Sequence, residues 1–288
     1  MSRTLRRVLG KLASPIERRA ARVYQAGPRL ADAMAVCRRF KDAGTATILG
    51  LQNKTGEDSR VAADAYLEAI ESLAGTGLDC YVSVKAPPLQ FSHELFGALL
   101  ARSRDAGIRL HLDSHAMETA DPTFALLDRA GPVPLRDIGV TLPGRWKRSL
   151  ADADWAVERG VSVRVVKGQW EDPGEPGRDP GQGFLQVVER LAGRAAHVGI
   201  ASHNASLVRD SARRLSEKGT SCELELLYGL PARRALSVAR EFSMNNRMYV
   251  PYGCPSLPYS AGDIPKNLIS ALWLLRDVLR RAEFTNGL

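Results

Sequence analysis

The sequence predicts a (β/α)8 barrel of the TIM type, an α/β fold, preceded by an N-terminal helical extension. Two observations support this prediction. Short apolar runs of β-type composition alternate eight times with stretches of helical periodicity, and 288 residues are enough for eight such units. Regular alternation of this kind produces parallel strands that are buried on both faces, and the number of units fits a barrel better than a doubly wound sheet.

The predicted strands follow one another at intervals that leave room for a helix. They are Thr45–Leu51, Cys80–Val84, Ile108–Asp113, Ile138–Leu142, Val161–Val166, His197–Ser202, Ser221–Leu226 and Met248–Pro251. The clearest helices between them are Arg60–Leu73 and Asn204–Lys218. Glycines follow predicted helices at Gly77, Gly107, Gly131, Gly160 and Gly219, where a left-handed C-cap is favoured. We therefore expect a basic, amphipathic helical segment at residues 1–43 and a barrel domain at residues 44–288.

The net charge of +8 is concentrated near the N-terminus, because residues 1–22 carry +6 of it. This distribution argues against a nucleic-acid-binding domain, and no nucleic-acid-binding motif follows the basic segment. Its apolar residues, from Leu5 to Ile16, have helical spacing. The segment is interpreted either as a solvated helix that covers one end of the barrel or as a helix on an anionic membrane surface.

The remaining composition indicates a cytoplasmic globular protein, with peripheral contact at the inner face of the membrane as an option left open by the basic segment. No apolar run reaches the ~18 residues that a membrane-spanning helix needs. The four cysteines lie far apart and form no CxxC pair, which favours reduced thiols over a disulfide framework or a zinc ribbon.

Polar residues gather at the predicted carboxyl ends of the strands, where barrel enzymes place their chemistry. They are Lys85, Asp113, His115, Thr141, Arg145, Arg164, Lys167, His203, Asn204, Glu225, Tyr252 and Tyr259. No GxGxxG or GxxxxGK[ST] loop follows a strand, which excludes the Rossmann and P-loop modes of phosphate binding. Arg164 and Lys167-Gly168 are suited to holding a phosphate, although Arg164 could instead be a buried partner of a carboxylate.

A second pattern allows a different chemistry. In an extended strand, His111, Asp113 and His115 share one face, where they could bind a divalent metal with His203 and Glu225 as further ligands. A metal-dependent hydrolase is therefore an alternative, although we assign no metal ligands.

Seven short motifs follow the predicted strand ends in order, and together they cover the chain from about Thr45 to Asn267. They are Ser83-Val-Lys85 (SVK), Leu110-His-Leu-Asp113 (IDxE), Lys147-Arg-Ser149, Arg164-Val-Val-Lys-Gly168 with Trp170 (RLVKGAYW), Ala201-Ser-His-Asn204 (ATHN), Glu223-Leu-Glu-Leu-Leu-Tyr-Gly-Leu230 (EFQMLYGM) and Tyr249-Val-Pro-Tyr-Gly253 (YVPYG). In this order and spacing they resemble the signatures of the proline dehydrogenase family, FAD-dependent barrels that oxidise proline to pyrroline-5-carboxylate.

The resemblance implies roles for the matching residues. Arg164 would lie near flavin N5 and stabilise the reduced ring. The residues Lys167, Gly168, His203 and Asn204 would hold the ribose and diphosphate of FAD, and Glu225 is assigned to the same cofactor-binding group. Lys85, Asp113 and Tyr259 would border the substrate.

The chain departs from the family pattern where the substrate is bound. The family motif YLxRRLxEN has two arginines that clamp the substrate carboxylate, but Gly262 and Asp263 occupy those positions here, and Lys266 replaces the Glu. Pro143 and Arg145 replace the Gln and Tyr that are usual on the fourth strand.

These departures bear on the substrate. An ionised Asp263 would repel a carboxylate and attract a cation, which favours a cyclic or secondary amine, or a proline whose carboxylate is masked. Two other interpretations stay open: Lys266 or Arg145 binds the carboxylate, or Asp263 only caps the last helix.

The sequence therefore predicts a FAD-dependent oxidoreductase that oxidises a C–N bond in a proline-like imino acid or amine, in proline metabolism or amine oxidation. The resemblance to the family implies a quinone as the electron acceptor. The alternatives are the metal-dependent hydrolase and a catalytically silent flavin-binding homologue.

Overall fold

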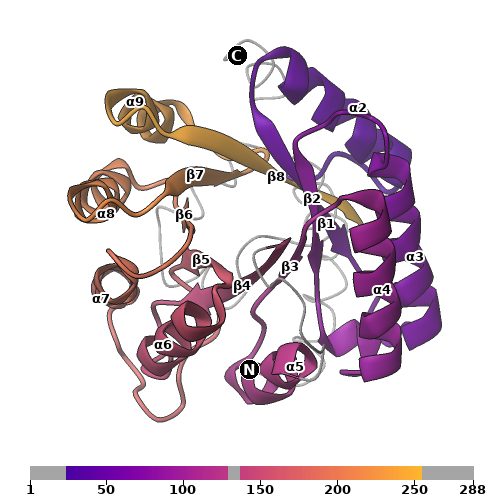
Figure 1. The fold of residues 1–288 in the computed structure, drawn as a ribbon, viewed down its shortest axis with the longest axis horizontal. Coiled ribbons are helices and arrows are strands. Elements are labelled where there is room, and N and C mark those ends of the chain that lie inside the picture. The colour runs from indigo at the N-terminus through magenta and orange to yellow at the C-terminus, as the bar shows by residue number, and fades with distance from the viewer. Residues whose placement is uncertain (1–23, 129–136, 255–288) are drawn as a thin grey trace, which may run out of the picture.

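The computed structural model describes residues 24–128 and 137–254, and these residues form a closed barrel of eight parallel strands (Figure 1). The strands are β1 (Ala46–Gln52), β2 (Cys80–Val84), β3 (Leu110–Leu112), β4 (Ile138–Pro143), β5 (Ser162–Val166), β6 (Val198–Ala201), β7 (Cys222–Leu227) and β8 (Asn245–Gly253). Each strand pairs with the next along the chain, and β1 pairs with β8 in a register that aligns Ile48 with Tyr249. The predicted fold is confirmed.

Helices surround the strands on the outside (Figure 1). They are α2 (Leu30–Asp42), α3 (Ser59–Leu73), α4 (His93–Ala106), α5 (Ala120–Asp128), α6 (Ser149–Arg159), α7 (Pro180–Leu191), α8 (Ala205–Glu217) and α9 (Arg233–Glu241), with the 3-10 turns η1 (Pro87–Leu89) and η2 (Met117–Thr119). Asp58 and Asn204 cap α3 and α8 through their side chains. Gly107 and Gly160 end α4 and α6 in the left-handed conformation, as predicted from their position after helices.

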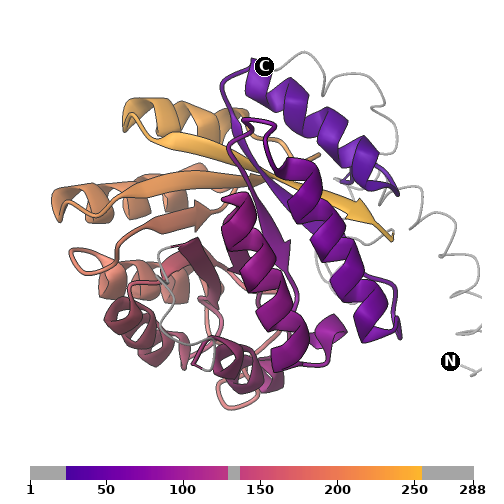
Figure 2. The same ribbon diagram turned by 45° about the vertical axis from the view of Figure 1, so that its right-hand side comes forward.

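The described part of the N-terminal region contains α2, which contacts both β1 and β8 (Figure 2). Its buried residues Ala33, Met34, Cys37 and Phe40 join the core of the barrel. Residues 1–23 lie outside the described residues, as do Gly131, Tyr259 and Asp263, so the predictions for them are not tested. Within the described residues, no helix is long and apolar enough to cross a membrane.

The strands alternate between two environments. One set of positions faces the helices and is apolar: Leu49, Val82, Leu112, Val140, Val165, Ile200, Leu224 and Val250 are all buried there. The other set faces the barrel axis and is largely polar: Tyr81, Ser83, His111, Thr141, Arg164, Glu223, Glu225 and Arg247 are buried there. The apolar core is therefore a shell between strands and helices, whereas the axis is lined by hydrogen-bonding and charged groups.

Candidate active site

A cavity of about 770 Å³ opens at the carboxyl ends of the strands. It is lined by eight of the ten residues assigned to the site from sequence: Lys85, Asp113, Arg164, Lys167, Gly168, His203, Asn204 and Glu225. The other two, Tyr259 and Asp263, lie outside the described residues. The structure thus brings the described candidates to one mouth of the barrel, as their positions at strand ends indicated.

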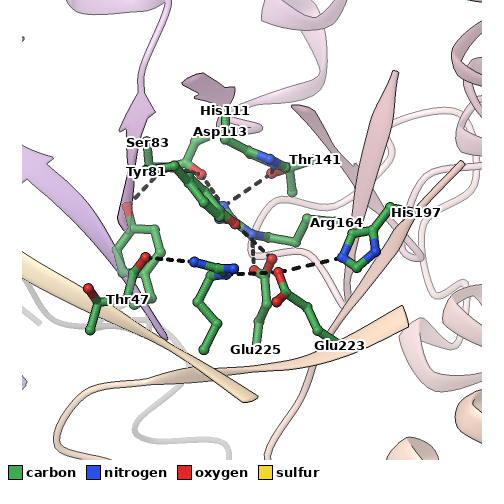
Figure 3. Close-up of polar contacts among 12 residues, drawn as sticks. Thr47, Tyr81, Ser83, His111, Asp113, Thr141, Arg164, His197, Glu223 and Glu225 are labelled. Carbon is green, nitrogen blue, oxygen red and sulfur yellow. Dashed lines mark hydrogen bonds and ion pairs between the residues drawn. The ribbon is translucent and has the colours of Figure 1, made fainter. Parts of the chain in front are cut away.

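Arg164 on β5 is the centre of this site, with its guanidinium buried on the barrel axis (Figure 3). Its Nε donates to Glu225 Oε2 at 2.5 Å, its Nη1 donates to Asp113 Oδ1 at 2.6 Å, and its Nη2 donates to Tyr81 Oη at 2.9 Å. Arg164 is therefore a buried ion-pair partner of two carboxylates, and it also lines the cavity. Charge-assisted bonds of this kind hold the guanidinium plane in one orientation.

Asp113, directly after β3, is ionised by its surroundings. Its Oδ1 accepts from Ser83 Oγ at 2.7 Å, its Oδ2 accepts from Tyr249 Oη at 2.8 Å, and Lys85 Nζ lies 3.8 Å from Oδ2. Burial alone would raise the pKa of this carboxyl, but Arg164 and then Lys85 lower its pKa to about 2. At neutral pH the mouth therefore contains a fixed negative charge.

Glu225 on β7 is held from two sides. Tyr81 Oη donates to its Oε1 at 2.7 Å, and Arg164 binds the other oxygen. Burial raises the pKa of the Tyr81 phenol, so the phenol stays protonated and acts as a donor to the carboxylate. Gly199 on β6 makes room for Glu225, because a Cβ at Gly199 would lie 2.5 Å from Oε1.

Lys85, which follows β2, is anchored rather than free. Its Nζ donates to the Leu51 carbonyl at 2.5 Å, and its backbone N–H donates to Tyr66 Oη at 3.0 Å. Burial lowers the pKa of the Lys85 ammonium, and the nearby positive charge of Arg164 lowers it further. The negative charge of Asp113 raises the pKa and so opposes both effects. The ammonium lies at the rim beside the Asp113 carboxylate.

His203 is engaged by the barrel through both ring nitrogens. Nε2 accepts from the Leu227 N–H at 2.9 Å, so Nδ1 carries the proton and donates to the Pro231 carbonyl at 3.0 Å. Burial lowers the pKa of this ring, which agrees with a neutral imidazole. Any contact between His203 and a ligand in the cavity must therefore use its ring carbons. Asn204 accepts from the Leu207 N–H and begins α8 at the mouth.

The rim after β5 has the features of an anion site. Lys167 is exposed and has no ion-pair partner among the described residues, and Gly168 has φ +93 with its Cα packed so closely on Pro143 that a Cβ would approach to 2.8 Å. Arg145 Nε is buried with no hydrogen-bond partner in the described part of the chain, while its Nη1 lies 3.3 Å from Glu171 Oε1. Two cations and a close backbone approach suit a phosphate.

An aromatic pair lies at the same rim. His115 and Trp170 stack with ring centroids 5.2 Å apart, and both line the cavity. Burial lowers the pKa of His115, so its imidazole is neutral at pH 7. The pair therefore offers a flat, uncharged surface next to the two cations.

The metal-dependent alternative gains no support. Among residues 24–128 and 137–254, no group of three His, Cys, Asp or Glu side chains could hold a metal ion. His111 Nε2 is hydrogen-bonded to Thr141 at 2.9 Å, and the ring stacks on Tyr81. The Asp113 oxygens are already engaged, as are both nitrogens of His203.

The assignment of site residues from sequence missed Tyr81 and Tyr249, whose hydroxyls bind Glu225 and Asp113. One signal was available, since Tyr81 shares strand parity with Ser83 and Lys85 and therefore points toward the axis. Gly50 also gives space to Tyr249, because a Cβ at Gly50 would lie 2.2 Å from that ring.

Comparison with known proteins finds similarity in sequence and in fold. No family model matches the sequence. Two curated relatives match it, namely proline dehydrogenase 1 of Bacillus subtilis subsp. natto and of Bacillus subtilis strain 168. Each is 22% identical to this chain over 282 residues, and each alignment covers 92% of this chain and 92% of the relative.

Solved structures share the fold. Proline utilization A (PutA) of Bdellovibrio bacteriovorus, inactivated by N-propargylglycine, superposes on 90% of this chain with a TM-score of 0.71 and 15% identity. PutA of Corynebacterium freiburgense covers 97% with a TM-score of 0.65 and 16% identity. The present chain spans only 32% and 33% of these two PutA chains.

Fold and site define a (β/α)8-barrel protein with a charged, ligand-sized mouth at the carboxyl ends of its strands. The chain is similar to the two proline dehydrogenases over nearly its whole length, and it shares the barrel fold of the PutA structures.

Proposed function

We propose that the protein is a proline-dehydrogenase-like enzyme that uses FAD to oxidise a C–N bond in a proline-like imino acid or in a cyclic or secondary amine. The observation that carries this proposal is the buried Arg164, which two carboxylates orient at the floor of a ligand-sized mouth. In the reaction, the substrate carbon loses a hydride and its nitrogen loses a proton, so that a C=N bond forms and two electrons leave the substrate.

The residues of the mouth fit FAD. A cavity of about 770 Å³ is within the range of cofactor sites. Its rim supplies Lys167, the buried and unpartnered Arg145 Nε, and the narrow turn at Gly168, which suit the diphosphate. When bound, the flavin supplies the two-electron acceptor for the hydride.

The side chains then have separate tasks. Arg164 presents fixed positive charge on the axis, where it stabilises negative charge that develops above it. The ionised Asp113 attracts a substrate ammonium, and its Oδ2 is the carboxylate oxygen nearest to Lys85. Lys167, Gly168, His203, Asn204 and Glu225 form the proposed cofactor-binding group, while Lys85, Tyr259 and Asp263 border the substrate with Asp113.

Within this class we favour a substrate that lacks a free carboxylate or carries a masked one, because Gly262 and Asp263 stand where the family motif has its arginine clamp. We expect the purified protein to show flavin bands near ~375 and ~450 nm. Under anaerobic conditions, pyrrolidine or prolinamide should bleach the flavin faster than L-proline at equal millimolar concentration.

Each outcome of this experiment has one meaning. Rapid bleaching by L-proline contradicts the preference for a substrate without a free carboxylate and leaves the proposed oxidoreductase in place. Bound flavin that no imino acid or amine reduces supports the catalytically silent alternative. A colourless protein that takes up no flavin on reconstitution contradicts the proposed function as a whole.

We also propose that a membrane quinone accepts the electrons and that residues 1–22, with +6 net charge, contact the anionic surface that holds it. The full chain should then co-sediment with phosphatidylglycerol vesicles at low salt and be released at high salt. Neutral vesicles, and a variant with Arg18, Arg19 and Arg22 replaced by Gln, are the controls. Binding to anionic vesicles no better than to neutral ones would contradict the proposal.

A further inference from the structure

Glu225 gives the Arg164 guanidinium a second carboxylate partner, in addition to Asp113. The side chains of Arg164 and Glu225 are each only 5% exposed, so solvent screens their interaction weakly. Tyr81 fixes the other oxygen of Glu225, and the absence of a side chain at Gly199 provides the space that the carboxylate occupies. The family motif EFQMLYGM has Gln at this position, so the carboxylate is a departure made by this chain.

The buried charges at the mouth balance because of Glu225. Arg164 and Lys85 are cations, and Asp113 and Glu225 are anions, all within one connected set of contacts. His111, which also faces the axis, is neutral, because burial and then Arg164 lower its pKa well below its usual range. Without the Glu225 carboxylate, the cluster would have a net charge of +1.

We propose that Glu225 lowers the reduction potential of the bound flavin by offsetting the charge of Arg164. This inference rests on the proposed function, in which the flavin lies over the mouth. Reduction by two electrons with uptake of one proton leaves the ring one unit more negative, so a nearby positive charge favours the reduced form. A cluster with no net charge favours the reduced flavin less than a cluster with a charge of +1. The reduced flavin then passes its electrons more readily to an acceptor such as a quinone.

The structure offers a matched control in Glu223. This residue lies two positions earlier on β7, on the same face of the strand, and its Oε1 accepts from Arg247 Nε at 2.8 Å. Both glutamates are buried and paired with an arginine, but Glu223 lies about 7 Å further along the strand from the mouth. Replacing either glutamate by Gln removes one buried negative charge beside an arginine, at two different distances from the mouth.

The test is the midpoint potential of the flavin in the holoprotein, measured by anaerobic reductive titration against reference dyes. Glu225→Gln should raise the equilibrium constant for flavin reduction at least tenfold, which is about 30 mV for a two-electron couple. Glu223→Gln should change it less than threefold. Glu225→Asp keeps the charge and should also stay within threefold of the parent.

Each result decides the inference. An unchanged or lowered potential in Glu225→Gln with flavin bound overturns it, and so does an equal rise in Glu223→Gln or Glu225→Asp. Thermal unfolding and flavin content verify that each variant is folded and loaded. Glu225→Met, which is also neutral and of similar length, takes the place of a Glu225→Gln protein that loses its flavin. A parent protein that binds no flavin overturns the proposed function and this inference with it.

Discussion

At Gly139 on β4, the space for a side chain is taken by the ring of His111 on the neighbouring strand. A Cβ at Gly139 would lie 2.1 Å from His111 Nδ1 and 2.7 Å from Cε1. The ring cannot move freely, because it is hydrogen-bonded to Thr141 and stacked on Tyr81. We expect Gly139→Ala to lower the free energy of unfolding by about 1–3 kcal/mol, the cost of overpacking, as measured by urea denaturation.

Gly97 provides the control for this substitution. It is exposed in α4, and a Cβ there would meet nothing within 4 Å. Gly97→Ala should therefore raise the free energy of unfolding, by up to about 1 kcal/mol, because Ala is the better helix former. Equal stability of Gly139→Ala and the parent would show that the His111 ring yields without cost.

At the scale of the elements, hydrophobic periodicity predicted the eight strands well, because seven of the eight begin and end within two residues of the prediction. The exception is β8, which begins at Asn245 rather than Met248. Its first residues are polar, and Arg247 points to the axis, where it pairs with Glu223 and Asp79. A strand whose inner face is charged lacks the apolar signal on which the prediction depended.

For the site, the sequence predicted which residues lie at the mouth but not which of them contact one another. In barrel enzymes the catalytic residues lie at the carboxyl ends of the strands. This rule selected eight residues that the structure describes, and all eight line the cavity. The partnerships were not predictable, because Arg164 and Glu225 are 61 residues apart and Arg164 and Tyr81 are 83 apart. Which axial side chains meet depends on the closure of the barrel, and a linear pattern does not contain that geometry.

For the whole molecule, buried carboxylates on the axis make stability depend on pH. Burial opposes the charge of Glu223, but His197 and Arg247 lower its pKa to about 2, and the pKa of Asp113 is also about 2. The unfolded values are near ~4, so the unfolded chain takes up protons first as the pH falls. Stability should fall as the pH drops toward 2, by on the order of 2 kcal/mol for Asp113 alone. The buried neutral rings of His111 and His203 extend the decline upward to about pH 6.5, where the unfolded chain begins to protonate them.

Urea denaturation between pH 7 and pH 3 measures this dependence, and Glu223→Gln should flatten it. Asp154 is the control, because Arg190 and Arg194 lower its pKa to about 2 as well, but on the exposed surface. In ~0.5 M salt the effect of Asp154→Asn on the acid dependence should disappear, whereas that of Glu223→Gln should persist. A parent protein equally stable at pH 3 and pH 7 would contradict the expectation.

The separation of an apolar shell from a charged axis also governs how such a chain can diverge over evolutionary time. In the shell, Leu49, Val140 or Ile200 can each be exchanged for another aliphatic residue of similar volume at modest cost. On the axis, a residue in place of Glu225 that accepts no hydrogen bond strands a buried donor of Arg164. Residues of the shell can therefore be substituted one at a time, which allows the sequence identity to relatives to fall to 22%. A substitution on the axis needs a second substitution that restores the lost hydrogen bond or charge.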